Sequence, residues 1–284
     1  MASRRAIGAY FGILPGRFRD GPRLYAAYAA SVVLNRVAPS RFGSVGLWIP
    51  GQQNLCVSLD GIRFYVRPHT NDLDLISRTH EPVTTRWFRV EPRDTVVDVG
   101  AHIGRYALMA ATKASKVIAV EPDPSSFQLL KTNVALNGFS NVVVVPEALS
   151  STRGTRLLRL ASRDNTGTSS ISPDGVAEPT VGEISAEVRV RSDTLDHLVE
   201  TFHVRRIDWL KIDVEGHEIE VLRGGPAALK ITRKLILEVT ESTDETCRRI
   251  VELAGFELDG IERGDPASNW LLLKKDGLGP AAGT

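Results

Sequence analysis

Runs of apolar residues alternate with amphipathic stretches along most of this chain. The runs have the length and the β-branched content of buried strands, and they lie at residues 95–99, 116–120, 141–145, 207–213, 234–240, 256–261 and 270–274. The stretches between them have the apolar spacing of helices, at residues 103–111, 124–136, 219–222 and 243–254. Because strands and helices alternate, the pattern predicts an α/β fold with a doubly wound, mostly parallel sheet.

The first 90 residues have a different pattern. Residues 55–59 and 62–66 alternate apolar and polar side chains around Asp60-Gly61, which is a strong hairpin signal. Residues 23–34 are mostly apolar and suit a helix that packs on the domain or covers its substrate site. We therefore expect three parts, namely a helical and hairpin extension at 1–90, the main domain at 91–275 and a disordered Gly/Ala-rich tail at 276–284.

Two smaller features are predicted between these elements. Residues 71–79 indicate a short helix before the main domain. Within the domain, residues 155–160 and 186–191 indicate paired strands of an insertion, joined by a polar loop at 162–183. Long loops in compact domains often act as lids, so this loop could line an acceptor pocket; a flexible linker is the alternative.

The most informative stretch is TVVDVGAHIG at 95–104, a buried strand followed by a glycine turn and the start of a helix. The next strand, at 116–120, runs directly into Glu121. Glycines let backbone approach a ligand, the new helix offers free N–H groups, and an acid at the end of the next strand can accept both hydroxyls of a ribose. Asp98 and Glu121 are 23 positions apart, close to the length of one β-α-β step. The two segments therefore predict a nucleoside site.

The glycine spacing indicates which nucleoside is bound. A dinucleotide site needs Gly-x-Gly-x-x-Gly to wrap a pyrophosphate, whereas this chain has Asp98-x-Gly100-x-x-x-Gly104, with His102 where a middle glycine could sit. The Asp98 carboxylate before the turn would repel a pyrophosphate and suits a cationic ligand. S-Adenosylmethionine (SAM) has a ribose, a sulfonium and an ammonium but no phosphate, so the turn is typical of a SAM site. An ordinary α/β turn without a ligand is the alternative.

A second motif, DWLKIDVEGHE at 208–218, is again a strand that runs into an acid-rich turn. The chain resembles the FkbM family of SAM-dependent methyltransferases in the segments VVDVGAHIG, VIAVEPDP, EALS after the third strand, and LKIDVEGHEIEVLRGG. The resemblance covers about residues 75–240 and implies a Rossmann-like class I methyltransferase fold. One departure is His102, where asparagine is expected in most relatives; a histidine ring N–H can still donate.

The expected cofactor residues lie at or just past the carboxyl ends of strands, where such sheets bind ligands. Asp98 is assigned to the SAM ammonium and Glu121 to the ribose hydroxyls. The family resemblance further implies that Glu147 and Ala148 contact the adenine edge and that Glu81 faces the cofactor. The full predicted set is Glu81, Asp98, Gly100, His102, Gly104, Glu121, Pro122, Glu147 and Ala148.

Catalysis by this class needs a nucleophile placed in line with the methyl group and, for a hydroxyl acceptor, a base. Asp213, at the end of the fourth strand, is the first candidate to orient or deprotonate the acceptor. His217 is the second, since its ordinary pKa suits a base near neutrality, and Glu215 lies between them. For His217, a surface position in a first helical turn is an equal alternative. The three residues could also form a metal site, but no further ligand is evident, so no metal is assigned.

Composition and charge limit the classes of partner and the compartment that we expect for the protein. The net charge of +1 gives no overall field that favours nucleic acid. Cys56 and Cys247 match neither a zinc spacing nor a disulfide framework, which favours a reducing, cytoplasmic compartment. Seven arginines against Asp20 in the first fifty residues leave peripheral contact with an anionic membrane open, although no apolar run has the length that spans a bilayer. A signal peptide is disfavoured because charges follow the apolar stretch 6–14 at once, without a clear cleavage site.

The sequence thus predicts a SAM-dependent methyltransferase that acts on a hydroxyl group of a sugar or natural-product small molecule. Two alternatives stay open, a non-catalytic SAM-fold binding module and an NAD(P)-dependent oxidoreductase. The intact Asp98, Glu121 and Asp213 speak against the first, and the glycine spacing speaks against the second. No motif identifies the acceptor or the oligomeric state.

Overall fold

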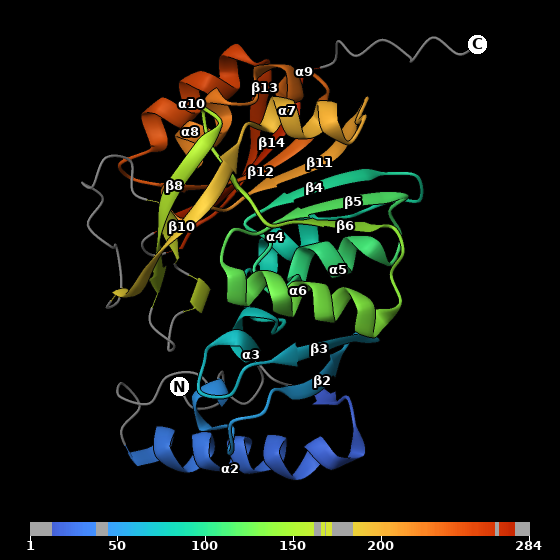
Figure 1. Cartoon of the computed structure of the whole chain (residues 1–284), viewed down its shortest axis with the longest axis vertical. Helices are drawn as coiled ribbons and strands as arrows, with labels where there is room; N and C mark the ends of the chain where they lie inside the picture. Colours follow the sequence, from blue (N-terminus) through green and yellow to red (C-terminus); the bar gives the residue numbers. More distant parts are fainter. Residues whose placement is uncertain are drawn as a thin grey trace.

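The centre of the protein is a seven-stranded sheet, which the computed structural model of the chain shows between layers of helices (Figure 1). The structure describes residues 13–37, 45–161, 166–167, 169–171, 184–264 and 267–275. In spatial order the strands are β13 (Phe256–Glu262), β14 (Ala267–Lys274), β12 (Thr232–Thr240), β11 (Ile207–Ile212), β4 (Thr95–Val99), β5 (Lys116–Val120) and β6 (Val142–Val145).

The sheet is mostly parallel, as the sequence predicts. Strands β12, β11, β4, β5 and β6 pair in parallel, and β14 is antiparallel to both of its neighbours. After β4 the chain first builds one side of the sheet through β5 and β6, and later the other side through β11 and β12. The strand order therefore reverses beside β4, and open α/β sheets bind ligands outside the carboxyl ends of the strands at such a point.

Helices cover both faces of the sheet, which confirms the doubly wound arrangement. One face carries α4 (Pro82–Trp87), α5 (Arg105–Ala111) and α6 (Pro124–Asn137), and the other carries α7 (Leu195–Thr201), α8 (Glu218–Arg223), α9 (Pro226–Lys230) and α10 (Asp244–Leu253) (Figure 1). Alternate strand residues serve the two layers: Val96 and Trp209 belong to one apolar cluster, Val97 and Leu210 to the other. Burial on both faces explains why the strands appear in the sequence as continuous apolar runs.

Local signals set the ends of α6. The side chain of Asp123 accepts the N–H of Ser125 at 2.9 Å, and Pro124 occupies the first helical position. The helix ends at Gly138, whose φ of +68° is the left-handed conformation that glycine adopts most readily. The predicted helix at 124–136 is therefore confirmed, and it extends one residue further, to Asn137.

The extension forms its own small layer beneath α6 (Figure 1). Its elements are β1 (Leu14–Pro15), η1 (Phe18–Asp20), α2 (Gly21–Val37), η2 (Val45–Trp48), β2 (Leu55–Leu59), β3 (Ile62–Val66) and α3 (Asp72–Leu75). The side-chain oxygens of Asn133 and Asn137 in α6 accept the backbone N–H groups of Tyr65 (2.7 Å) and Arg63 (2.8 Å), which joins β3 to the main domain. The predicted hairpin is thus confirmed, and it is fixed to the main domain by the side-chain amides of Asn133 and Asn137.

The helix expected at residues 23–34 is confirmed as part of α2, and it packs on the rest of the extension. It buries Leu24 and Ala27 completely and contacts η2. Arg23 donates to the carbonyl of Pro50 at 2.8 Å, so one of the basic residues serves a structural contact. Among the described residues, no helix is long and apolar enough to cross a membrane. Arg4 and Arg5, part of the predicted basic segment, lie outside the described residues.

One predicted helix is wrong in its length. The helix expected at 71–79 spans only Asp72–Leu75. The reason is Arg105, whose guanidinium donates to the carbonyl groups of Ser77 (2.6 Å) and His80 (2.7 Å). A longer helix would direct these carbonyls to its own N–H groups, so the buried guanidinium stabilises an irregular segment instead.

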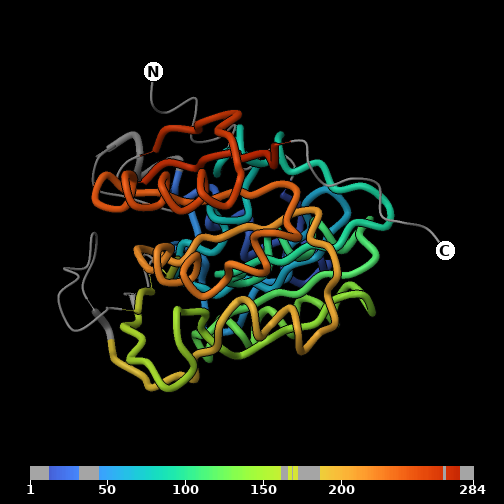
Figure 2. The backbone as a smooth tube through the Cα atoms, turned by 90° about the horizontal axis from the view of Figure 1, so that it is seen from above, coloured from blue at the N-terminus to red at the C-terminus, as the bar shows by residue number. Residues whose placement is uncertain are grey.

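The insertion forms a separate four-stranded sheet. Its strands, in spatial order, are β7 (Ala148–Leu149), β10 (Ile184–Asp193), β8 (Gly154–Ala161) and β9 (Ser170–Ile171). Strands β8 and β10 are antiparallel partners, which confirms the predicted pair, and Figure 2 shows them in yellow-green and yellow at one side of the molecule. Of the loop at 162–183 the structure describes only 166–167 and 169–171; the rest of it, like the predicted tail at 276–284, lies outside the described residues.

Candidate functional site

A cavity opens at the carboxyl ends of β4, β5 and β11, beside the point where the strand order reverses. It measures about 1100 Å³ with its open mouth, which suits a small-molecule site. Nearly all of the residues that the sequence proposes line it, namely Glu81, Asp98, Gly100, His102, Glu121, Pro122, Glu147, Ala148, Asp213, Glu215 and His217. Gly104 is not among the lining residues. The fold therefore brings the two sequence motifs and the segment before α4 to one place.

The glycine turn is shaped by contact with the second motif. Gly100 and Gly104 have left-handed φ values of +83° and +101°. A Cβ atom on Gly100 would overlap the carbonyl oxygen of Asp213, whose N–H donates to the carbonyl of Val99 at 3.0 Å. From the sequence we expected a ligand to require glycine here. In the structure the backbone of the Asp213 loop already fills that space, so packing alone requires glycine.

Glu121 follows β5, and the backbone holds its carboxylate. Oε2 accepts the N–H of His102 and Oε1 accepts the N–H of Asp123, both at 2.8 Å. The residue is only 7% exposed, and burial raises the pKa of Glu121 to about 8 in spite of these donors. The carboxylate is thus fixed beside the turn, where hydroxyl groups of a ligand can donate to it.

Asp98 offers an unsatisfied acceptor to the cavity. It lies near the end of β4 with 1% of its surface exposed, and neither carboxylate oxygen has a hydrogen-bond partner among the described residues. Burial raises the pKa of Asp98 to about 6, although the nearby Lys211 ammonium lowers it. Because an unpaired buried acceptor costs about 1–3 kcal/mol, a cationic or hydrogen-donating ligand would relieve the site.

Lys211 is a buried cation between the acids of the cavity. Its Nζ lies 2.5 Å from Oδ2 of Asp213 and 4.7 Å from the centre of the Tyr106 ring. Burial alone would lower the pKa of Lys211, but the surrounding carboxylates, led by Asp213, raise it above its ordinary value. The ammonium therefore stays charged and fixes the orientation of the Asp213 carboxylate.

Glu81 lines the cavity and is the residue directly before α4. Its φ of +45° lies in the left-handed region. Oε1 accepts from the Asn269 amide at 2.8 Å and Oε2 accepts from the Tyr106 hydroxyl at 2.7 Å. Burial would raise the pKa of Glu81, but the Lys211 ammonium and these donors bring it down to about 2. Glu81 is therefore a charged residue whose two oxygens are both engaged by the protein.

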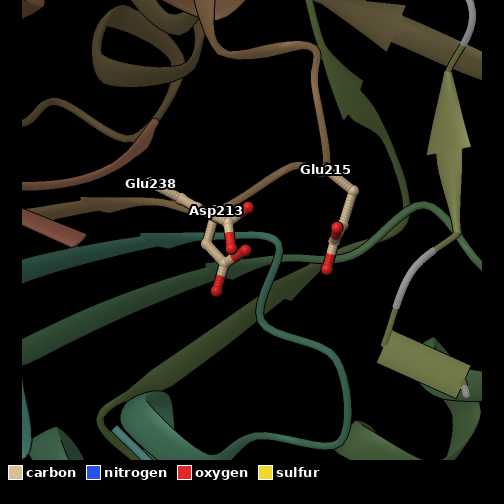
Figure 3. A group of neighbouring side chains, drawn as sticks. All are labelled: Asp213, Glu215 and Glu238. Carbon is tan, nitrogen blue, oxygen red and sulfur yellow. The ribbon is translucent and has the colours of Figure 1, made fainter. Parts of the chain in front are cut away.

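Three carboxylates converge on the cavity. Figure 3 shows Asp213 and Glu238 side by side, with Glu215 facing them from the loop after β11, and one oxygen of each lies within 4.8 Å of the others. Burial and neighbouring carboxylates raise the pKa of Glu215 and of Glu238 well above its ordinary value. The trio differs from the set considered from the sequence, because Glu238 takes the place of His217.

His217 lines the cavity, but its ring binds another part of the chain. The residue is 3% exposed, so the alternative of a surface position is wrong. Its Nε2 lies 3.0 Å from the Ser150 hydroxyl, and Nδ1 has no partner among the described residues. Burial lowers the pKa of His217, so the ring is neutral near pH 7.

The His102 ring connects the glycine turn to the extension. Its Nε2 lies 3.0 Å from a guanidinium nitrogen of Arg67, which is itself paired with Asp72 at 2.8 Å. Burial lowers the pKa of His102 to about 4, so the neutral ring accepts from Arg67. The backbone N–H of His102, rather than its ring, donates toward Glu121.

The insertion supplies the remaining wall of the cavity. Oε1 of Glu147 pairs with Arg191 at 3.0 Å, and Ala148 beside it is buried. The hydroxyl of Ser170 donates to the backbone carbonyl of Glu215 at 2.6 Å, which holds this part of the insertion against the acid-rich turn. Of the predicted loop, Thr166, Gly167, Ser169 and Ile171 line the cavity, and Ser170 does not.

Comparison with known proteins identifies similar chains. The family model described as Methyltransferase FkbM domain matches residues 98–260. The hexuronic acid methyltransferase AglP of Haloferax volcanii is 33% identical over 156 residues, which cover 54% of this chain and 59% of that protein. Methyltransferase sdnD of Sordaria araneosa is 30% identical over 192 residues, which cover 57% of this chain and 73% of that protein. The chain thus matches less than two thirds of the length of the first of these relatives.

Solved structures of methyltransferases are also similar. A methyltransferase FkbM from Methylobacillus flagellatus is 17% identical with a TM-score of 0.45, covering 64% of this chain and 44% of that one. A tRNA m1G37 methyltransferase from M. jannaschii is 13% identical with a TM-score of 0.46, covering 80% of this chain and 56% of that one.

Proposed function

Because the chain belongs to the FkbM methyltransferase family, we propose that it transfers a methyl group from SAM to a hydroxyl group of a sugar or natural-product small molecule. The relative named as a hexuronic acid methyltransferase supports a sugar acceptor. The observation that carries the proposal is the pairing of an unsatisfied, buried Asp98 with a fixed Glu121 around one glycine turn. The net charge of +1 supports a small-molecule acceptor rather than nucleic acid, and the two unpaired cysteines support a cytoplasmic location.

The residues of the cavity fit the chemical groups of SAM. Asp98 would accept from the ammonium, which satisfies its two free oxygens. Glu121 would accept from the ribose hydroxyls while keeping its two backbone donors. Glu147 and Ala148 would flank the adenine edge at the end of β6. Two buried acids and no phosphate-binding turn also disfavour an NAD(P)-dependent oxidoreductase.

The acid-rich turn would supply the chemistry at the acceptor. When bound, SAM supplies a methyl group already activated on its sulfonium. The protein must then hold the acceptor hydroxyl in line and take up its proton. Asp213 is the first candidate for this role, which the contact of its carboxylate with Lys211 at the cavity wall supports. Glu215 lies beside it, and neutral His217 is the second candidate base.

Calorimetric titration with SAM and with NAD, combined with a screen of hydroxylated acceptors, tests this proposal. SAM binding with methyl transfer is expected. SAM binding without transfer to any acceptor would indicate a binding module, and NAD binding without SAM binding would indicate an oxidoreductase. Either result would contradict the proposed function.

Glu121→Ala is expected to weaken SAM binding at least tenfold. The substitution removes a charge-assisted acceptor, which is worth on the order of 1.5–3 kcal/mol. Calorimetric titration measures the affinity, and circular dichroism checks the fold. Glu187→Ala is the control, because Glu187 is an exposed acid of β10 outside the cavity. A folded Glu121→Ala protein with wild-type affinity would refute the assignment to the ribose.

SAM affinity is also expected to rise with pH. The pKa of Glu121 is about 8 in the free protein, and only the carboxylate form accepts from both ribose hydroxyls. Binding must therefore displace a proton below this pKa, so affinity should increase about tenfold between pH 7 and pH 9. Glu121→Gln cannot titrate at this position and should show a flatter profile. Because titration of SAM itself affects both proteins equally, the difference between the two profiles reports Glu121. Parallel pH profiles for the two proteins would contradict the prediction.

A further inference from the structure

The parallel pairing of β11 and β12 brings two acids together at the cavity. Ile212 is the register partner of Leu237, so the residues that follow them, Asp213 and Glu238, are neighbours. Glu215 turns back toward them through a left-handed φ of +53°. One carboxylate oxygen from each of the three residues lies within 4.8 Å of the others (Figure 3). The cluster is thus built by the topology and by one unusual backbone conformation.

The charge of this cluster is only partly balanced. Lys211 contacts Asp213 at 2.5 Å and neutralises one carboxylate. Glu81 and Asp98 add negative charge on the same face of the sheet, next to Lys211. Carboxylates this close repel one another unless a proton or a cation lies between them. Protons or a positively charged ligand at the centre of the trio would relieve this repulsion.

A second, separate observation also indicates a ligand here. Asn269 is the direct register partner of Glu238 across β12 and β14, so their side chains lie on one face as neighbours. Asn269 is 7% exposed, and its amide nitrogen donates to Glu81 at 2.8 Å. Its side-chain oxygen is buried and has no partner among the described residues. A hydrogen donor near this oxygen, such as a water molecule held by a cation at the trio, would satisfy it.

We propose that Asp213, Glu215 and Glu238 bind one divalent cation of the hard class, Mg²⁺ or Mn²⁺, at the acceptor side of the cavity. Three carboxylates without a thiolate or imidazole form an oxygen-only set, which these ions prefer. Water molecules complete the coordination, and one of them donates to the oxygen of Asn269. No metal was assigned from the sequence because Glu238 lies 25 positions after Asp213 and outside both motifs.

A bound cation would make the site selective for hydroxylated acceptors. This step rests on the proposed function. Two neighbouring acceptor oxygens would displace water from the cation, and the cation would orient them and lower the pKa of the acceptor hydroxyl group. The hydroxyl proton then passes to water, and the acceptor oxygen forms its bond to the methyl carbon as the bond from that carbon to sulfur breaks. A vicinal diol or an α-hydroxy acid, both common in sugars and uronic acids, is the acceptor class that this arrangement favours.

Direct measurement of Mn²⁺ binding tests the proposal. Purified full-length protein is treated with chelator, dialysed and titrated with Mn²⁺, and free Mn²⁺ is followed by electron paramagnetic resonance. Wild type is expected to bind one Mn²⁺ saturably and Glu238→Gln to bind at least tenfold more weakly. Glu187→Gln, an exposed acid outside the cavity, is the matched control and should bind as wild type does. Absence of saturable binding in wild type, or equal binding in Glu238→Gln, would overturn the proposal.

Thermal unfolding distinguishes loss of the cation site from loss of the fold. Mn²⁺ should raise the Tm of wild type and of Glu187→Gln, because a ligand that binds only the folded state stabilises it. The Tm of Glu238→Gln without Mn²⁺ should stay close to that of wild type and should not rise when Mn²⁺ is added. A rise in Glu238→Gln equal to that of wild type would place the cation elsewhere and overturn the assignment.

SAM titration distinguishes failure of this proposal from failure of the proposed function. Glu238→Gln is expected to bind SAM within twofold of wild type, since Glu238 is not assigned to the nucleoside. Methyl transfer that persists unchanged after chelation, in a wild type without Mn²⁺ binding, would reject the cation alone. Saturable Mn²⁺ binding in a protein that binds no SAM would reject the proposed function and leave the cation site standing.

Discussion

Gly100→Ala should lower the free energy of unfolding by more than about 3 kcal/mol and abolish SAM binding. The added Cβ would overlap the carbonyl oxygen of Asp213. That oxygen cannot retreat freely, because the N–H of Asp213 is bonded to the carbonyl of Val99 at 3.0 Å. The glycine turn and the acid-rich turn would have to separate, and each forms part of the cavity wall. Urea denaturation and calorimetric titration with SAM measure the two effects.

Gly61→Ala provides a matched control for this prediction. Gly61 has a φ of +82°, almost the same as the +83° of Gly100, but a Cβ at Gly61 would meet nothing within 4 Å. It should cost only the left-handed conformation, about 1–2 kcal/mol, and leave SAM affinity unchanged. The difference between the two variants measures the contact of the two motifs. Equal losses of stability would show that this contact contributes nothing.

The sequence predicts the fold well where the signal is local. Asp123, Pro124 and Gly138 mark the ends of α6 without any tertiary information, and Asp60-Gly61 marks the hairpin. Strands buried on both faces are visible as continuous apolar runs, so the order of elements follows directly. The failure at 71–79 has a non-local cause, since the carbonyls of that segment bind Arg105, more than twenty residues later.

The residues of the candidate site also fall into those that local sequence patterns reveal and those that depend on non-local contacts. Asp98, Glu121 and Asp213 are found from the sequence because they lie at or just past the carboxyl ends of strands, which meet at one edge of the sheet. Lys211 could have been found, since it lies two positions before Asp213 on the same strand face. Glu238 could not, because its place depends on the register of β11 with β12, which no local pattern encodes.

The contacts of His102 show a further limit. Its ring Nε2 lies 3.0 Å from a guanidinium nitrogen of Arg67 and 3.8 Å from a carboxylate oxygen of Asp72, both in the extension. Neither residue lies in a motif. Arg67 directly follows β3 of the hairpin that packs on α6, and Asp72 is the first residue of α3. The extension therefore contacts the glycine turn directly, a contact that the sequence alone does not predict. A histidine in place of the expected asparagine is the single local sign of this connection.

Asp213→Asn is expected to reduce methyl transfer about a hundredfold or more while changing SAM affinity by less than Glu121→Ala does. The substitution keeps the shape of the side chain but removes the charge that pairs with Lys211 at 2.5 Å and the basicity that takes up the hydroxyl proton. Turnover and calorimetric titration with SAM, on protein checked by circular dichroism, measure the two effects. Full activity of Asp213→Asn would reject its role and make His217 the first candidate base.

Comparison with Glu238→Gln distinguishes a role of Asp213 as base from a role as ligand of the cation. If Asp213 only held a cation, raising Mn²⁺ should restore much of the activity of both variants, because each retains two of the three carboxylates. If Asp213 also orients or deprotonates the acceptor, excess Mn²⁺ should restore Glu238→Gln and leave Asp213→Asn inactive. We expect the second outcome, since the Asp213 carboxylate alone among the three is fixed by a buried ammonium, within the part of the chain that the structure describes.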